Sequence, residues 1–240
     1  MASMTLEECR ARNSALDQLL QLIPHWQLQQ LAERRIRKGT AMIVAGQRDE
    51  NLYILLDGVA DISREFSNGL RMTYYKVTAG DVVGLYELLG PSITRTATVL
   101  AHTDLVALTV PRSTVLEWYH SIPELVMAIT GRVLGRLFEA NSLLAECSSY
   151  NLLRSTVTYL LHVYSLYRCQ YGPSYDGPVR IAESRQEMAD FLGADVRSIN
   201  RSVERLKNAQ LITIQRGKIH IDAKQQQLLA QEKSSGCAGI

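Results

Sequence analysis

Six polar side chains in the C-terminal part of the chain have the chemistry and the spacing to contact a nucleic acid. They are Arg185, Gln186, Arg197, Ser198, Asn200 and Arg201. A guanidinium can donate two hydrogen bonds to O6 and N7 of guanine, and backbone N–H groups at a helix N-terminus favour phosphate. We therefore expect the first two residues to contact phosphate and the other four to contact base edges or phosphate.

The neighbouring residues carry the signals that begin and end short helices. Ser184 with Glu187 three positions later is the pattern of a capping box, and Gly193 is suited to end the first helix. Asp195 is a good N-cap for a second helix, whose apolar residues recur at steps of four and three. They are Ile199, Val203 and Leu206. Alternating apolar and polar residues around Arg216-Gly217 then predict a two-stranded wing, which completes a winged helix-turn-helix.

The charge of the chain is divided unevenly along its length. The whole chain carries a formal net charge of +2. Residues 1–150 contain 14 basic and 16 acidic side chains, whereas residues 151–240 contain 12 basic and 8 acidic ones. The C-terminal part is therefore the one expected to meet a polyanion, and double-stranded DNA is the expected partner.

Composition and cysteine spacing exclude several classes of protein. With 46% hydrophobic and 21% charged residues among 240, the chain is globular rather than disordered or disulfide-stapled. No apolar run approaches the ~18 residues of a membrane span, and the N-terminus lacks the order of a signal peptide. We therefore expect a cytoplasmic protein with no membrane partner. Cysteines at 9, 147, 169 and 237 have no CxxC spacing, so we expect no metal site.

Upstream of the winged segment the sequence changes from a helical to a β-rich pattern. Residues 14–35 are predicted as a helix broken near Pro24. Short β-rich runs then follow, separated by turn residues, at 41–44, 52–56, 59–63, 72–77, 97–101 and 105–110. This spacing predicts an antiparallel β-barrel or jelly roll, with a hairpin turn at Ser67-Asn68-Gly69.

A long helix is predicted over residues 123–150. Its apolar stripe advances by steps of three and four and comprises Val126, Ile129, Val133, Leu137, Ala140 and Leu144. The stripe fits two arrangements, packing of the helix on its own barrel or pairing of two chains in a homodimer. A second helix is predicted over 152–167, a Gly- and Pro-rich loop over 171–178, and a polar tail after Lys224.

This order of elements resembles the Crp/Fnr superfamily of bacterial transcription regulators. Four runs in the β-rich part are similar to the family's barrel signatures. They are KGT (38–40), GQRDENLYILLDG (46–58), AGDVVG (79–84) and RTATVLA (95–101). The segment 184–212 is similar to the family's helix-turn-helix over its whole length.

The resemblance implies an α+β fold in three parts. These are a sensory cyclic-nucleotide-binding-like barrel (1–122), a dimerisation helix (123–150) and a winged helix-turn-helix domain (151–240). It also implies a homodimer joined along the apolar stripe of the long helix, which makes the six stripe residues the expected dimer interface. The dimer is expected to sense a small effector, bind palindromic promoter DNA and act with RNA polymerase. No catalytic residues are implied, so we expect no enzyme. The alternative is a cyclic-nucleotide-binding regulatory or interaction module whose winged helix is degenerate and has no DNA target.

The resemblance further points to an effector cradle. Its residues here are Gly84, Arg95, Thr96 and, on the long helix, Asn141. An arginine beside backbone N–H groups suits a cyclic phosphate, while a structural ion pair is an equally open interpretation of Arg95. Cyclic AMP is not favoured, because Leu85 stands where the family has its ribose-binding Glu. Whether Glu87 substitutes for that Glu stays open, as do another effector, a haem or redox input, or none.

One position of the predicted recognition helix departs from the best-known members of the family. Arg197 stands where they have a Glu that accepts from cytosine, so their half-site is not expected here. Arg201 matches the family's guanine-reading arginine. The resemblance therefore implies one G in each half-site.

Overall fold

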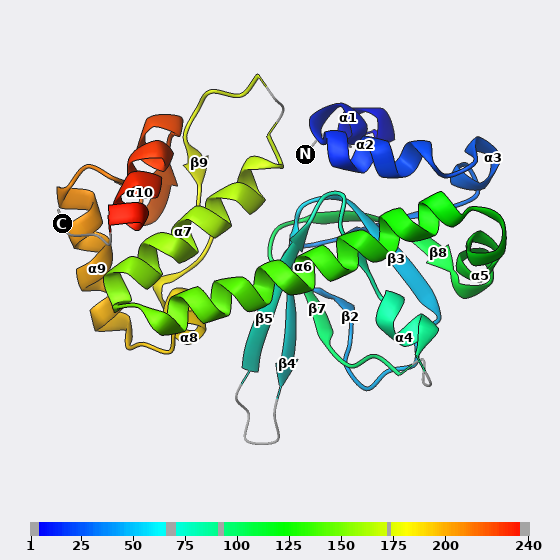
Figure 1. Ribbon diagram of the computed structural model, residues 1–240, viewed down its shortest axis with the longest axis horizontal. Coiled ribbons are helices and arrows are strands. Elements are labelled where there is room, and N and C mark those ends of the chain that lie inside the picture. Colours follow the sequence, from blue (N-terminus) through cyan, green and yellow to red (C-terminus); the bar gives the residue numbers. More distant parts are fainter. Residues whose placement is uncertain (1–4, 66–70, 91–93, 172–173, 236–240) are drawn as a thin grey trace. The chain divides into compact units, whose positions relative to one another are not determined.

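The computed structural model describes residues 5–65, 71–90, 94–171 and 174–235. The chain forms two compact units, Met1–Phe138 and Glu139–Ile240. The first unit is rich in β-strands and the second contains the winged helix-turn-helix, while the long helix α6 (Pro123–Ser149) contributes residues to both (Figure 1). The predicted α+β fold with its barrel, long helix and C-terminal winged helix-turn-helix is therefore confirmed.

Two four-stranded sheets build the first unit. One has the order β1-β8-β3-β6, and its strands are β1 (Ala32–Ile36), β8 (Leu105–Pro111), β3 (Asn51–Asp57) and β6 (Val82–Val83). The other has the order β2-β7-β4-β5, from β2 (Ala41–Ile43), β7 (Thr98–Ala101), β4 (Val59–Glu65) and β5 (Arg71–Thr78). Every described strand pairing is antiparallel, and inward-facing residues of both sheets share one apolar core, as in a jelly roll.

A second core covers the outer side of the first sheet. The helices that contribute to it are α1 (Leu6–Arg12), α2 (Ser14–Gln21), α4 (Leu85–Leu89), α5 (Arg112–Ser121) and the beginning of α6, with Leu28 from α3 (His25–Leu28). Trp118 is fully buried at its centre, and its indole N–H donates to Oε1 of Gln27 at 2.7 Å. The hydrogen bond satisfies the one polar atom of the indole, which lets this large side chain fill the core.

The prediction of a helix over residues 14–35 is wrong at its C-terminal end. The segment Ala32–Ile36 is strand β1 and pairs with β8, so tertiary hydrogen bonding overrides a helical local preference. Strand β6, helix α1 and helix α4 (Leu85–Leu89) were not predicted at all. The predicted hairpin turn at residues 67–69 lies outside the described residues.

Helix α6 has two different apolar faces. Ile129, only 2% exposed, lies in the core beneath the first sheet, with Val126 and Val133 packed against the same cluster. Assigning Ile129 to a dimer seam was therefore wrong, because this side chain is already enclosed by its own chain. The exposed apolar side chains lie on another face, and they are Met127 (75% exposed), Leu134 (60%), Leu137 (40%) and Phe138 (75%).

In the second unit, α7 (Leu152–Arg168) packs with the remaining helices. They are α8 (Arg185–Leu192), α9 (Val196–Asn208) and α10 (Ala223–Ser235). The wing consists of β10 (Thr213–Gln215) and β11 (Lys218–Ile221), with β9 (Val179–Arg180) as an unpredicted third strand beside β11. The polar tail predicted after Lys224 is in fact helix α10, which Leu229 anchors in the core. No described helix is long and apolar enough to cross a membrane.

Candidate DNA-binding surface and effector cradle

Local hydrogen bonds begin and end the two helices of the helix-turn-helix as predicted. The Ser184 hydroxyl accepts from the Glu187 N–H at 3.1 Å, and the Glu187 carboxylate accepts from the Ser184 N–H at 2.6 Å. Gly193 ends α8 at φ 62°, in the left-handed region that suits glycine. The capping box and the glycine turn place α9 directly after α8, with Asp195 as its N-cap.

The N-terminus of α9 holds a chain of three polar side chains. Asp195 accepts from the backbone N–H of Ser198 at 2.8 Å and from its hydroxyl at 2.7 Å. The same hydroxyl accepts from Nη2 of Arg201 at 2.8 Å. The hydrogen bonds from the Ser198 hydroxyl and backbone hold the pKa of Asp195 below its usual value. Arg201 is thus oriented one turn into the helix before any ligand arrives.

The structure places the other predicted DNA contacts on the same two helices. Arg197, Asn200 and Arg201 are exposed, whereas the apolar residues on the opposite face of α9, Ile199, Val203 and Leu206, are buried. On α8, the exposed Gln186 donates to Asp190 at 2.7 Å. Arg185 is half-buried against Met188, and burial lowers its pKa from the ordinary value. The roles of these residues toward DNA remain predictions.

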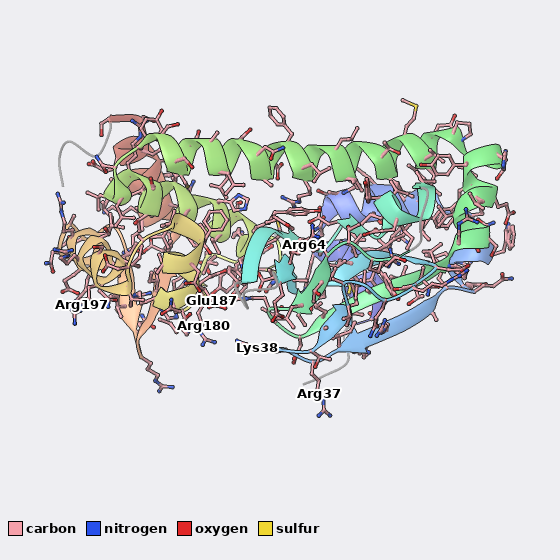
Figure 2. All side chains as sticks on the ribbon, turned by 90° about the horizontal axis from the view of Figure 1, so that it is seen from below. Arg37, Lys38, Arg64, Arg180, Glu187 and Arg197 are labelled. Atoms are coloured by element: carbon pink, nitrogen blue, oxygen red, sulfur yellow. The ribbon has the colours of Figure 1, made fainter. Side chains whose placement is uncertain are left out.

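Two further arginines extend this basic surface and were not assigned to it from the sequence. Arg180 lies on β9, opposite His220 of β11, and Figure 2 shows it and Arg197 directed outward on the same side of the unit. Arg216 is exposed in the turn of the wing at φ 49°, followed by Gly217 at φ 76°. The turn at Arg216 was recognisable, but the two-residue strand β9 has no periodicity that would reveal Arg180.

In the barrel, the guanidinium of Arg95 is buried and surrounded by acceptors. Its Nη1 donates to the Gly84 carbonyl at 3.0 Å and to Oε2 of Glu87 at 3.3 Å. Its Nη2 donates to the Asn51 carbonyl and lies 3.2 Å from Oδ2 of Asp49. With 2% of its surface exposed, Arg95 is thus the centre of a structural ion-pair cluster.

Glu87 lies within the same cluster and is 8% exposed. Its Oε1 accepts from the backbone N–H of Thr96 at 3.0 Å and from the Thr96 hydroxyl at 2.8 Å. Burial alone would raise the pKa of Glu87, but the bonds from Thr96 and the charge of Arg95 outweigh it and lower the pKa. Glu87 is therefore a carboxylate held by three donors.

Glycine is required at position 84. Gly84 has φ 92°, and a Cβ there would lie 2.5 Å from Nη1 of Arg95 and 2.9 Å from the Asn51 carbonyl oxygen. The structure thus brings together Gly84, Arg95 and Thr96, as expected for a cradle. The effector contact predicted for Asn141 remains a prediction, since Asn141 is exposed on α6 within the other compact unit.

The turn before the cradle is bound to α6. Arg132 donates to the carbonyls of Gly80 and Ala15, the first at 3.1 Å. Arg136 Nε lies 2.8 Å from Oδ1 of Asp81. Over the described ranges, no cluster of His, Cys, Asp and Glu has the arrangement of a metal site.

Two family models match the two units. The model of the cyclic nucleotide-binding domain matches residues 33–121, and that of the Crp-like helix-turn-helix domain matches residues 156–229. Together they span more than half of the chain, and solved structures of the CRP/FNR family share the fold. This chain belongs to the Crp/Fnr family of transcription regulators. Its α8–α9 unit is the DNA-binding helix-turn-helix of that family.

Several known proteins resemble the chain over most of its length. The global nitrogen regulator of Synechococcus elongatus is 23% identical over 191 residues, which cover 78% of this chain and 84% of that protein. FixK2 from Bradyrhizobium japonicum is 19% identical with a TM-score of 0.69, over 84% of this chain and 96% of that chain. A CRP-family regulator from Thermus thermophilus is 16% identical with a TM-score of 0.68 and the same coverage. These two structures show a shared fold.

The residues expected to form the effector cradle bind one another in the structure. The Nη groups of Arg95, which a cyclic phosphate would need, already bind two carboxylates and two backbone carbonyls. Leu85, which the resemblance places where the family has its ribose-binding Glu, is an apolar side chain that is 5% exposed.

Proposed function

We propose that this Crp/Fnr regulator is a homodimer that binds palindromic promoter DNA through α9. The observation that carries the proposal is the exposed face of α9, on which Arg197, Asn200 and Arg201 lie together. The Asp195–Ser198–Arg201 chain supports it, because a pre-oriented guanidinium loses less conformational entropy when it binds guanine. Arg185, Gln186 and Arg216 supply contacts to phosphate in this proposal.

The second face of α6 supports the dimer. Met127, Leu134 and Phe138 follow one another at steps of seven and four and are mostly exposed, which is unusual for apolar side chains of this size. Gly131 and Gly135 lie on the exposed side as well, with open space where a Cβ would be, so another helix can approach closely. A two-fold dimer presents two α9 helices and therefore selects two inverted half-sites.

Two partners in the proposal are supported by the family alone. A promoter-bound regulator acts on transcription through RNA polymerase, which we include as a partner. Sensing of a small effector by the barrel stays a prediction, and the paired state of Arg95 argues against a cyclic nucleotide as that effector. The proposal places the protein in the cytoplasm, because promoter DNA is available there.

The proposal is tested by selecting binding sites from a random duplex pool with wild-type protein and Arg201→Ala. We expect wild type to enrich a palindrome whose half-sites are about 10 base pairs apart. Arg201→Ala should lose preference for one G per half-site and about 1–3 kcal/mol of binding free energy. Arg37→Ala is the matched control, because Arg37 is exposed on the barrel and far from α9 in sequence.

Two results would overturn the proposal. One is a selection that enriches no sequence, together with a DNA affinity that does not fall as the salt concentration rises. Binding through phosphate contacts releases counterions and must weaken with salt. That result favours the alternative, a regulatory or interaction module with a degenerate winged helix. The other is an unchanged selected sequence for Arg201→Ala, which would place the reading of bases elsewhere.

A further inference from the structure

We propose that the Glu87 carboxylate is the resident anion of the cradle formed by Gly84, Arg95 and Thr96, so that this barrel is closed to phosphate ligands. The inference goes beyond DNA binding, because it concerns the regulatory input of the barrel. It states that the anion position is filled by the chain itself.

The three donors around Glu87 are the kind that bind a phosphate oxygen. They are a backbone N–H and a hydroxyl, both of Thr96 at 3.0 and 2.8 Å, and the Arg95 guanidinium at 3.3 Å. Charge-assisted hydrogen bonds of this type are stronger than neutral ones, and a carboxylate accepts them as well as a phosphate does. The cradle is therefore complete without a ligand.

Charge balance gives the second argument. The cluster contains one cation, Arg95, and two carboxylates, Asp49 and Glu87, whose side chains are 18% and 10% exposed. An incoming phosphate would be the third negative charge around one guanidinium, at a place with little water to screen the repulsion. Entry of a phosphate thus requires that Glu87 leaves first.

Donor capacity gives the third argument. Both Nη groups of Arg95 have two partners each. Its Nε is the guanidinium nitrogen that lacks a partner among the residues described. One N–H cannot hold a phosphate against two carboxylates, so Arg95 has no spare capacity for a cyclic nucleotide.

Glu87 and the residues that bind it lie close together in the fold, so replacing the carboxylate by a bound anion changes only this site. Glu87 is in the single-turn helix α4, which begins directly after Gly84, and Arg95 and Thr96 lie just before β7. Removal of the carboxylate leaves the Thr96 donors and Nη1 of Arg95 facing an emptied position. We therefore expect a small anion to bind there once Glu87 is shortened.

The test uses the full chain as wild type and Glu87→Ala, with Glu117→Ala as an exposed control on the same domain. Thermal unfolding and calorimetric titration are measured with formate, inorganic phosphate and cyclic AMP, against chloride at equal ionic strength. Wild type and Glu117→Ala should bind none of the three. Glu87→Ala should unfold at a lower temperature and recover about 2–4 °C in formate or phosphate, by mass action on the folded state.

Two outcomes would overturn the inference: sub-millimolar binding of cyclic AMP by wild type, or a folded Glu87→Ala protein that neither formate nor phosphate stabilises. Glu87→Gln decides the question if the alanine variant does not fold, since it keeps the shape and removes the charge. Its Tm should fall below that of wild type, and an equal Tm would show that the cradle needs no anion. None of these measurements involves DNA, so their failure is separate from a failure of the proposed function.

Discussion

Nε of Arg136 on α6 forms a bifurcated ion pair with both carboxylate oxygens of Asp81 in the barrel, 2.8 Å from Oδ1 and 2.9 Å from Oδ2. Asp81 is 5% exposed and also accepts from the backbone N–H of Thr78 at 2.7 Å. The chain runs from Asp81 to Gly84, whose carbonyl binds Arg95. A segment of a few residues, from Asp81 to Gly84, therefore connects the long helix to the cradle.

The first prediction concerns this ion pair. Arg136→Ala removes the cation that lies 2.8 Å from the buried Asp81 carboxylate, which should lower the free energy of unfolding by about 1–3 kcal/mol. Thermal denaturation measures this as a fall in Tm of about 2–4 °C for each kcal/mol. Arg37→Ala, an exposed arginine that Figure 2 shows directed away from the barrel, should change the stability by less than about 0.5 kcal/mol. Equal effects of both substitutions would mean that the ion pair between Arg136 and Asp81 makes no specific contribution to the free energy of unfolding.

The second prediction concerns acid stability. Asp61 on β4 is buried beside Lys76 and within 3.0 Å of Nδ1 of His102. Burial raises its pKa, but the bond from His102 and the charges of Lys76 and His102 lower it to about 2, from an ordinary 3.8. A lowered folded-state pKa stabilises the fold above the ordinary pKa, and this contribution disappears as the pH falls toward 2.

Asp61→Asn should therefore destabilise the barrel by about 2 kcal/mol at neutral pH and flatten the loss of stability between about pH 4 and 2. Denaturant unfolding at a series of pH values measures both effects. Glu117→Gln, on the exposed side of α5, serves as the control. If Asp61→Asn loses stability between about pH 4 and 2 as steeply as wild type does, the lowered pKa does not belong to this cluster.

The third prediction concerns the dimer face of α6. Leu134→Asp combined with Phe138→Asp places two charges where we propose that the helices of two chains meet, and should weaken dimerisation at least about 30-fold. Sedimentation velocity over a range of concentrations measures the dissociation constant. Trp26→Asp, at an exposed apolar side chain on α3, should leave the dimer intact. A double variant that stays as dimeric as wild type would exclude this face.

The fourth prediction separates positioning from reading in the DNA complex. Arg216 lies at the tip of the wing. As a phosphate contact it should contribute to DNA affinity equally for every base sequence. Arg216→Ala should weaken binding to all duplexes alike and reduce the slope of log affinity against log salt by about one unit for each phosphate that is no longer neutralised. Fluorescence titrations of cognate and scrambled duplexes at several salt concentrations distinguish this from Arg201→Ala, which should affect the cognate duplex alone.

Local signals in the sequence were sufficient for the helix-turn-helix. The capping box of Ser184 with Glu187, the glycine at position 193 and the N-cap at Asp195 act within one turn of chain, so the residue types alone predict where α8 and α9 begin and end. The short β-rich runs of the barrel, separated by turn residues, are equally local signals. Strand β1 shows the limit of such reasoning, because Ala32–Ile36 becomes a strand only through its pairing with β8, about 70 residues away in sequence.

The tertiary structure alone decided the questions that depend on distant partners. The sequence left Arg95 open between an ion pair and a ligand contact, since nothing local reveals that Asp49 and Glu87 meet its guanidinium. It also could not tell which apolar stripe of α6 packs on the barrel, because Ile129 and Leu134 have the same hydrophobic character. Burial of Ile129 against the first sheet resolves this, leaving Leu134 exposed. Helical periodicity defines faces, and only the surrounding elements determine what each face meets.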